Sequence, residues 1–437
     1  MYGTVWRKPS ARTLRILVGL TILMTLLTGL RYLKEPPSPD DDQTTNWWPV
    51  VNAIVDGRGF VSCLPEYFPF CKDESPTAMR EPIPLLVHAG LARATGRSLW
   101  AASLFEALLN IAAMWLLFAL GRRLAGDRIG LLAAALWATY LPGYQLVLNI
   151  AGDQLATVFL LLGALSIDHA QRTGRSGSLI LSGLMFGAAA LCRSAALAFG
   201  VVAVVAVFLD RSRGTLLVRS RQAAVIGAGL ALTLLPWIAR NYHTFGRVFI
   251  GSTLSGYNLY RHNASLTRPD ALHFVAAQEG QGYIDSLITA HPELTGHEDE
   301  PTMNALYKSA GQQIITTHPW QYLKLCAYRG VLLWTNLGVN TAYGKPEGPL
   351  DHLVALLQAV LLVLMLLGCC RELTGRWPIA AAVGLYILMH MAVVARLRFM
   401  IPAMPFVMLM ASVGLERILR SLGARPRMRK APTKRGL

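Results

Sequence analysis

Three adjacent carboxylates form the most conspicuous chemical group in the sequence. They are Asp40, Asp41 and Asp42, and they follow the first apolar run of the chain by only a few residues. Carboxylates this close repel one another, so the pKa of at least one of them is raised. Such a group can act as a general base or bind a cation. A solvated charged turn is the alternative, and the run taken alone favours that alternative.

A second set of chemically interesting residues consists of arginines in or beside apolar stretches. A guanidinium group pairs bidentately with phosphate, so these arginines are candidates for binding an anion. For the first of them, a side chain snorkelling to an interface beside Glu81 is the alternative. The set is Arg80, Arg193, Arg240, Arg396 and Arg398.

Other polar residues stand near these arginines in the sequence. Asp153 lies at the edge of an apolar run, where an ionisable group is a functional hypothesis by default. It is also well suited to be a helix N-cap, which is the alternative. His390, Tyr242 and Asn258 are further candidates for a shared pocket.

The composition shows which kind of protein must position these groups. The 437 residues are 53% hydrophobic and only 15% charged, whereas a soluble domain has about 25% charged residues. Apolar runs of about 20 residues recur along the chain, and each can cross ~30 Å of hydrocarbon. This excludes a disordered, fibrous or nucleic-acid-binding protein. It predicts an all-α polytopic membrane protein.

The runs predict about ten transmembrane helices. The stretch 178–209 is too long for one helix and contains Arg193, so two short spans should meet there. The net charge of +16 comes from 41 Lys and Arg against 25 Asp and Glu, and much of it lies at the two ends of the chain. Lys and Arg mark the cytoplasmic side, so both termini should be cytoplasmic. The predicted spans lie near 14–33, 99–120, 129–147, 151–168, 178–193, 195–209, 223–239, 352–370, 377–395 and 399–418.

This topology divides the chain into outer and inner parts. An apolar segment at 320–337 contains Lys324 and Arg329, and counting it as a span would put the basic tail outside. We therefore expect an amphipathic helix on the outer surface there. The predicted parts are a cytoplasmic N-terminus (1–13), the first span (14–33), a periplasmic loop with interfacial helices and the acid (34–97), spans two to seven (98–239), a periplasmic segment (240–350), three final spans (351–418) and a basic cytoplasmic tail (419–437).

The topology places the candidate arginines and carboxylates on one side of the membrane. Arg396 and Arg398 defy the charge bias that the rest of the chain obeys, so they need another role, and anion binding is the natural one. Together these residues predict a pocket for a phosphate-bearing amphiphile beside a base. Cys63 and Cys71 lie in the first outer loop, where an oxidising compartment would let them form a disulfide; free thiols are the alternative.

These residues resemble a known family pattern. The chain is similar to the GT-C class of integral membrane glycosyltransferases, in particular to the bacterial branch related to protein O-mannosyltransferases and the lipid A aminoarabinose transferase. The resemblance covers about residues 14–418. It depends mainly on the blocks Pro236–Gly246 and Arg396–Pro405, together with Asp40–Asp42, Arg80–Pro84 and the glycine-rich stretch that ends at Arg193.

The resemblance implies a function. The donor would be a sugar linked to polyprenyl phosphate, and the acceptor a hydroxyl or amine of a lipid, glycan or protein. Transfer would invert the anomeric carbon at the periplasmic face of a bacterial inner membrane, with a loop-one aspartate as base and the arginines on the lipid phosphate. No cofactor is required, and a divalent cation remains an open alternative.

One departure from the family pattern affects the catalytic acid. Aligning Gly57–Phe60 with the family's Gly-x-Gly-Phe puts Gln43 where the acid is expected, so the base would be Asp42, shifted by one residue, or Asp40 or Asp41. Two other functions stay open. A transporter or flippase would bind the same phosphate but should show repeat symmetry, which is not visible. A non-catalytic partner in envelope assembly would not need the aspartates.

Overall fold

The computed structural model describes residues 9–39, 42–72, 74–148, 150–369 and 373–423. Within these ranges the protein is helical and has no β-strand beyond one bridge between Val61 and Pro76. The α-helices are α1 (Ala11–Lys34), α2 (Asp42–Val55), α3 (Pro82–Thr95), α4 (Leu99–Ala125), α5 (Asp127–Ala138), α6 (Leu141–Gln145), α7 (Asp153–Thr173), α8 (Ser176–Ala190), α9 (Leu197–Leu209), α10 (Leu216–Phe245), α11 (Leu254–Asn263), α12 (Ala277–Thr289), α13 (Glu300–Thr317), α14 (Pro319–Thr335), α15 (Val339–Ala342), α16 (Pro349–Cys369), α17 (Leu373–Val393) and α18 (Met404–Gly423).

Fewer spans are clear than the sequence predicts. Four helices of the described chain, α1, α4, α10 and α16, are long and apolar enough to cross a membrane. A fifth span results if α5 and the following helical segment to Leu148 count as one, although they are bent by 51°. Other apolar helices, such as α8, are shorter. The helical membrane architecture is therefore confirmed, whereas the number of ten spans is not.

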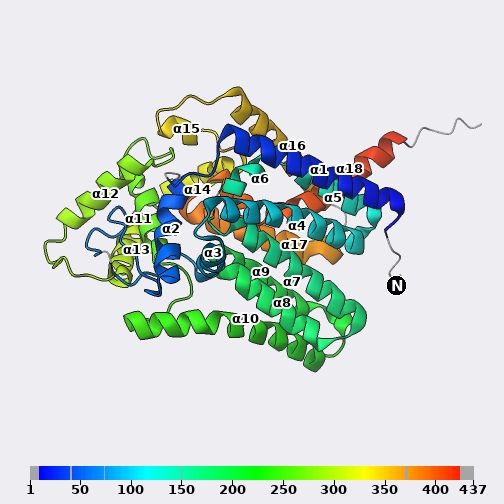
Figure 1. The fold of residues 1–437 in the computed structure, drawn as a ribbon, viewed down its shortest axis with the longest axis horizontal. Coiled ribbons are helices and arrows are strands. Elements are labelled where there is room, and N and C mark those ends of the chain that lie inside the picture. Colours follow the sequence, from blue (N-terminus) through cyan, green and yellow to red (C-terminus); the bar gives the residue numbers. More distant parts are fainter. Residues whose placement is uncertain (1–8, 40–41, 73, 149, 370–372, 424–437) are drawn as a thin grey trace, which may run out of the picture.

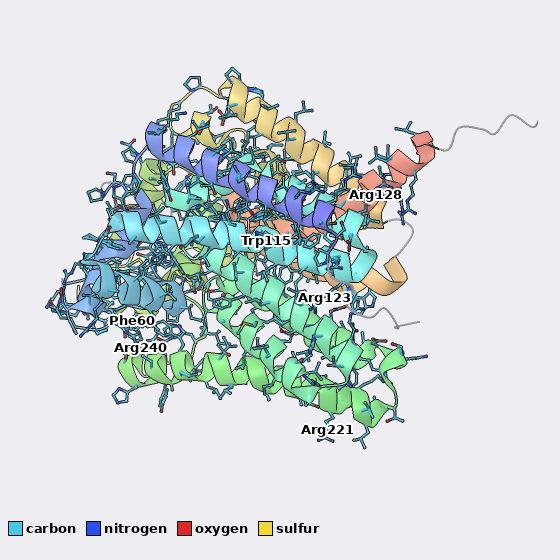
Figure 2. All side chains as sticks on the ribbon, turned by 45° about the vertical axis from the view of Figure 1, so that its right-hand side comes forward. Phe60, Trp115, Arg123, Arg128, Arg221 and Arg240 are labelled. Atoms are coloured by element: carbon cyan, nitrogen blue, oxygen red, sulfur yellow. A yellow bond between two sulfur atoms is a disulfide. The ribbon has the colours of Figure 1, made fainter. Side chains whose placement is uncertain are left out.

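The long helices run along one axis of the molecule (Figure 1). Helices α2, α11, α12 and α13 gather at one end, while the start of α1 and the end of α18 lie at the other. Figure 2 shows the same polarity in the side chains: Arg123, Arg128 and Arg221 lie toward one end, and Phe60 and Arg240 toward the opposite end. The segments predicted to be outer thus lie together, away from Arg123, Arg128 and Arg221, which lie between predicted spans on the side predicted to be cytoplasmic.

The break predicted at Arg193 is present. Helix α8 ends at Ala190, and a 3-10 turn over Ser194–Ala196 leads into α9. Helix α8 packs closely on α10, because Gly183 of α8 and Gly229 of α10 let the two backbones touch; a Cβ on Gly183 would lie 2.1 Å from the carbonyl oxygen of Ile226. Small residues at such crossings are typical of membrane helices.

The segment at 320–337 forms helix α14, as expected. Its Lys324 is exposed, but its Arg329 is buried among α11, α14 and the end of α17. Whether α14 lies on the membrane surface stays a prediction.

Candidate active site

Asp153 and Arg193 form a buried ion pair. Helix α7 starts at Asp153, and its N-cap is Gly152 in a left-handed conformation (φ 79°). A side chain at that position would collide with Pro84, whose Cγ would lie 2.4 Å from the added Cβ. Asp153 therefore does not cap the helix, and the alternative role considered above is wrong. Its carboxylate instead accepts a hydrogen bond from Nε of Arg193 at 2.5 Å, with the aspartate only 2% exposed.

The ring of Phe399 joins this pair to two other candidate residues. The guanidinium carbons of Arg193 and Arg398 lie 4.9 and 5.2 Å from the ring centroid. The imidazole of His390 stacks on the same ring at 5.3 Å. The hydroxyl of Tyr386 donates to the carbonyl oxygen of Phe399 at 2.7 Å and so holds the backbone of this residue. The structure thus brings Asp153, Arg193, Arg398 and His390 together.

Glu81 ties the start of α3 to this cluster. It is the N-cap residue of α3, with Pro82 at the first helical position, where proline is favoured. Its carboxylate accepts hydrogen bonds from the backbone N–H (3.2 Å) and the hydroxyl (2.8 Å) of Ser194. Sequence reasoning treated Glu81 only as a neighbour of Arg80. In the structure it is the link between α3 and the arginine-bearing turn.

Arg80 lies between two aromatic rings on the other side of Glu81. Its guanidinium carbon is 5.5 Å from the Trp47 ring centroid and 5.6 Å from that of Tyr67. Trp47 is the sixth residue of α2, which begins at Asp42. The backbones of Asp42 and Trp47 are therefore about 7.5 Å apart along the helix axis. Asp40, Asp41 and the side chain of Asp42 lie outside the described residues, so the position of the predicted base is not described.

The segment before Arg80 is held by Glu300 of α13. The buried carboxylate accepts hydrogen bonds from the backbone N–H of Ala78 (2.8 Å) and the hydroxyl of Thr253 (2.7 Å). Burial raises the pKa of Glu300, and its hydrogen bonds with Thr77, Ala78 and Thr253 only partly offset this effect. A residue more than 200 positions away therefore fixes the approach to Arg80.

The other two candidate arginines lie elsewhere. Arg240 is enclosed by the rings of Phe60, Trp237 and Phe245 at 5.1–5.4 Å and donates to the carbonyl oxygen of Phe60 (Figure 2). Arg396 lies over Phe274 and donates to the hydroxyl of Tyr343 at 2.8 Å. The five arginines therefore do not share one set of contacts; only Arg193 and Arg398 share the Phe399 ring.

The two remaining pocket candidates do not join the cluster. The ring of Tyr242 is 61% exposed, and Asn258 is half-buried on α11. No hydrogen bond connects either residue to the Phe399 cluster in the part of the chain that the structure describes.

Comparison with known proteins places this geometry in a family context. A family model described as dolichyl-phosphate-mannose-protein mannosyltransferase matches residues 79–239, from just before Arg80 to just before Arg240. A search of curated proteins gave no match. The structure is similar to that of the Archaeoglobus fulgidus oligosaccharyltransferase tethered with an acceptor peptide (TM-score 0.54, 14% identity, covering 94% of this chain and 50% of that one). It is equally similar to the same organism's AglB in complex with an inhibitory peptide and a dolichol-phosphate (TM-score 0.54, 17% identity, 94% and 51%).

The chain has the GT-C fold. It spans about half the length of these archaeal proteins. The mannosyltransferase model covers Arg80, Asp153 and Arg193, whereas Arg396, Arg398 and Phe399 lie outside the matched range.

This GT-C protein contains a buried polar pair that sequence reasoning missed. Nε2 of His88 on α3 and Oε1 of Glu106 on α4 are 2.9 Å apart, and the side chains are 1% and 0% exposed. Nδ1 of His88 and the second carboxylate oxygen of Glu106 have no hydrogen-bond partner among the described residues. The signal was available, because Glu106 is an acidic residue in the middle of the predicted span 99–120.

Two further features concern the outer loop and metals. The structure joins Cys63 and Cys71 in a disulfide, with their Cα atoms 5.2 Å apart. In the described part of the chain, no group of three or more His, Cys, Asp or Glu residues is arranged to hold a metal ion. Because Asp40 and Asp41 are outside that part, this finding does not test a cation bound by the acidic run.

Proposed function

We propose that this protein is a glycosyltransferase that moves a sugar from a polyprenyl-phosphate donor to a hydroxyl or amine acceptor, with inversion at the anomeric carbon. The observation that carries the proposal is the cluster of Asp153, Arg193, Arg398 and His390 around Phe399 in a chain with the GT-C fold. These residues come from segments that are far apart in the sequence, with Asp153 on α7 and Arg398 after α17. Their convergence fits a binding site better than a solely structural role.

The arginines of the cluster suit the phosphate of the donor. When the bond between the anomeric carbon and the phosphate oxygen breaks, negative charge grows on the phosphate, and guanidinium groups stabilise that charge. Arg193 and Arg398 are our candidates for this role, with Arg80 beside Trp47 as a third contact. The structural relative AglB, in complex with a dolichol-phosphate, supports a lipid phosphate as the ligand class.

The base would come from the acidic run. A carboxylate of Asp42, Asp41 or Asp40 would accept the acceptor's proton while the acceptor's oxygen or nitrogen attacks the anomeric carbon, and the lipid phosphate would leave. Asp42 is the strongest candidate, since it starts the helix whose Trp47 lies under Arg80. The transferred sugar would be a hexose or a pentose. No cofactor is needed in this scheme, and a divalent cation stays an alternative.

The membrane placement is part of the proposal. We propose about ten spans, both termini in the cytoplasm of a bacterium, and a site facing the periplasm from the inner membrane. The gathering of α2, α11, α12 and α13 at the end opposite to Arg123, Arg128 and Arg221 supports this arrangement.

The test is transfer of label from polyprenyl-phosphate sugars in membranes that contain the protein. We expect Asp42→Asn to abolish transfer and leave donor binding intact, whereas Arg398→Gln should weaken donor binding. Glu293→Gln, an exposed carboxylate on the outer segment, is the matched control. Transfer that persists in the triple Asp40/Asp41/Asp42→Asn variant would refute the assignment of the base. Donor binding without any transfer by the wild type would instead favour a flippase or an assembly partner.

A further inference from the structure

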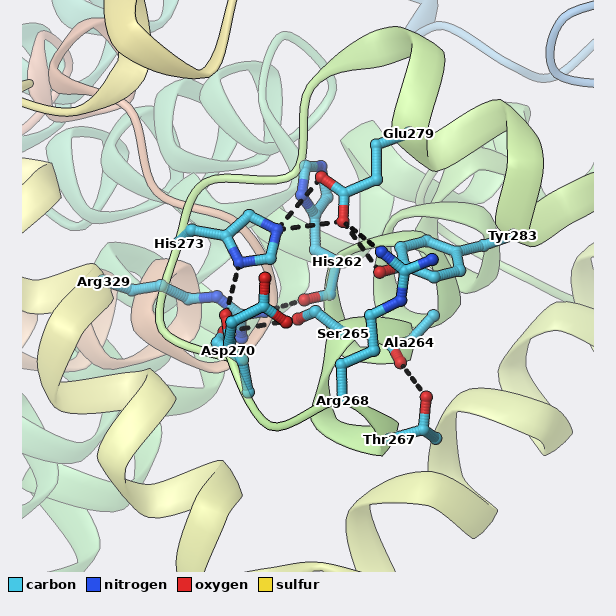
Figure 3. Close-up of polar contacts among 11 residues, drawn as sticks. His262, Ala264, Ser265, Thr267, Arg268, Asp270, His273, Glu279, Tyr283 and Arg329 are labelled. Carbon is cyan, nitrogen blue, oxygen red and sulfur yellow. Dashed lines mark hydrogen bonds and ion pairs between the residues drawn. The ribbon is translucent and has the colours of Figure 1, made fainter.

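A second polar pocket lies in the outer segment, away from the Phe399 cluster. It is formed by α11, the loop before α12, α14 and the end of α17. Its enclosed volume is about 10 Å³, the room of one water molecule, so a larger group would bind at its open edge. His262, His273 and Arg329 contribute its polar lining, and Phe274, Leu332 and Val394 contribute apolar walls. Figure 3 shows the polar residues around it. The donor-site assignment above uses none of these residues.

The most deeply buried cation here is Arg329. It is 4% exposed and donates to the side-chain oxygen of Asn263 (3.1 Å), the carbonyl oxygen of Ala392 (3.2 Å) and the carbonyl oxygen of His262. All of these acceptors are neutral. They satisfy the hydrogen bonds of the guanidinium group and leave its positive charge uncompensated.

Two more arginines add to this charge. Arg261 is buried on α11 with its guanidinium carbon 5.8 Å from the Tyr257 ring centroid. Arg396 rests on Phe274, which lines the pocket, and its Nε is buried without a hydrogen-bond acceptor among the described residues. Within the described chain, Arg261, Arg329 and Arg396 have no carboxylate at ion-pair distance. An excess of buried positive charge is costly unless an anion compensates it.

The carboxylate of Glu279 is already engaged. Glu279 lies 2.9 Å from Nε2 of His273, accepts from the hydroxyl of Tyr283 at 2.8 Å and lies 3.7 Å from Arg268 (Figure 3). Glu279 therefore pairs with His273 and Arg268 and does not neutralise Arg261, Arg329 or Arg396. The positive charges of the arginines act on His262. Burial, and then the charges of Arg261, Arg329 and Arg396, lower the pKa of His262 well below its usual value. A neutral imidazole in this place can donate one N–H to an anion.

We propose that the edge of this pocket is an anion-binding site for a phosphate or carboxylate group, in the positive field of Arg261 and Arg329. His262 of the lining and Arg396, which lies beside the pocket on the ring of Phe274, would hold the anion. The site is distinct from the donor site, because Arg398, two residues after Arg396, lies on Phe399 with Arg193. The group could belong to a soluble or acceptor-borne anion or to the headgroup of an anionic lipid. The proposal concerns binding alone and does not depend on sugar transfer.

The test measures thermal stability of the full chain in an uncharged maltoside detergent. Inorganic phosphate and acetate are titrated against chloride at equal ionic strength, so that screening is constant. We expect saturable stabilisation of the wild type by phosphate, and an apparent Kd at least about tenfold weaker in Arg396→Gln and in His262→Phe, as for a lost charge-assisted hydrogen bond. Arg268→Gln removes a cation of the same segment that already pairs with Glu279, and should bind normally. If Arg396→Gln fails to fold, Arg396→Lys can be used instead. This variant keeps the positive charge but loses the bidentate geometry of the guanidinium group, and should bind phosphate more weakly than the wild type.

Further arms separate the two sites and the two sources of the anion. Stabilisation by phosphate that survives in Arg193→Gln supports a second site, whereas loss in Arg193→Gln with retention in Arg396→Gln overturns it. If added phosphatidylglycerol, but not phosphatidylcholine, removes the phosphate effect, the occupant is a lipid headgroup; if neither does, the anion is soluble or acceptor-borne. The proposal is overturned if phosphate, acetate and phosphatidylglycerol all fail to stabilise the wild type saturably.

Discussion

Removing one partner of the buried His88–Glu106 pair should be far more damaging than removing both. The two side chains are 1% and 0% exposed, so water does not screen either of them. Their second polar atoms have no partner among the described residues, so nothing else compensates for a lost contact. Leaving one member of such a pair unsatisfied costs about 1–3 kcal/mol, whereas apolar replacement of both partners is often neutral or stabilising. His88→Leu and Glu106→Met should each lower the free energy of unfolding by that amount.

The double variant of His88 and Glu106 shows whether the two side chains stabilise each other or contribute to stability independently. We expect His88→Leu/Glu106→Met to lose less than about 1 kcal/mol, so the coupling energy in the double-mutant cycle should be several kcal/mol. The free energy of unfolding can be measured by denaturation with sodium dodecyl sulfate in mixed micelles. Arg58→Leu, which removes exposed ion pairs with Asp56 and Glu74, should show no measurable change. If the double variant loses as much as the two single variants together, the two side chains do not stabilise each other.

Three further predictions concern the outer segments. Cys63→Ser should destabilise the protein by about 2.5 kcal/mol, the loop-closure value for eight residues, and Cys71→Ser by the same amount; equal denaturation midpoints with and without reductant would contradict this. Glu300→Gln should cost about 1–3 kcal/mol, since the amide cannot accept all the hydrogen bonds of the buried carboxylate, whereas exposed Glu293→Gln should cost nothing measurable. Burial lowers the pKa of His273, but its hydrogen bonds to Asp270 and Glu279 outweigh this and raise the pKa overall. The contribution of His273 to stability is therefore complete below about pH 6.5 and lost as the pH rises through the raised pKa; melting temperatures of the wild type and His273→Gln should converge at alkaline pH.

The parts of the fold that sequence predicted depend on local chemistry. The largely apolar stretch 178–209 is too long for one span and contains a charged residue, so its length and Arg193 together predicted the break. The outer and inner segments followed from the distribution of arginine. The number of spans was harder, since apolar helices shorter than 18 residues can be either spans or buried segments.

The side-chain directions could not be predicted without knowing where each helix ends. The block Pro236–Gly246 was expected to leave its helix near residue 239, but α10 continues to Phe245. Residues i and i+2 of a helix face different directions, so Tyr242 points away from Arg240 and is exposed. Arg396 has an extended backbone (φ −143°, ψ 147°) directly before a 3-10 turn. This geometry sends Arg396 to Tyr343 and Arg398 to Phe399, although the two arginines are only two residues apart.

The way the candidate arginines are held explains how they could serve an anion at all. Each of the five lies within 5.6 Å of an aromatic ring centroid, whereas in the described chain Arg80, Arg240 and Arg396 have no carboxylate at ion-pair distance. A ring face stabilises a guanidinium group by about 0.5–2 kcal/mol without neutralising its charge. A carboxylate would hold the same side chain more firmly, but it would compete with the ligand. Aromatic rings therefore fix Arg80, Arg240 and Arg396 in place and keep their charge for an anion.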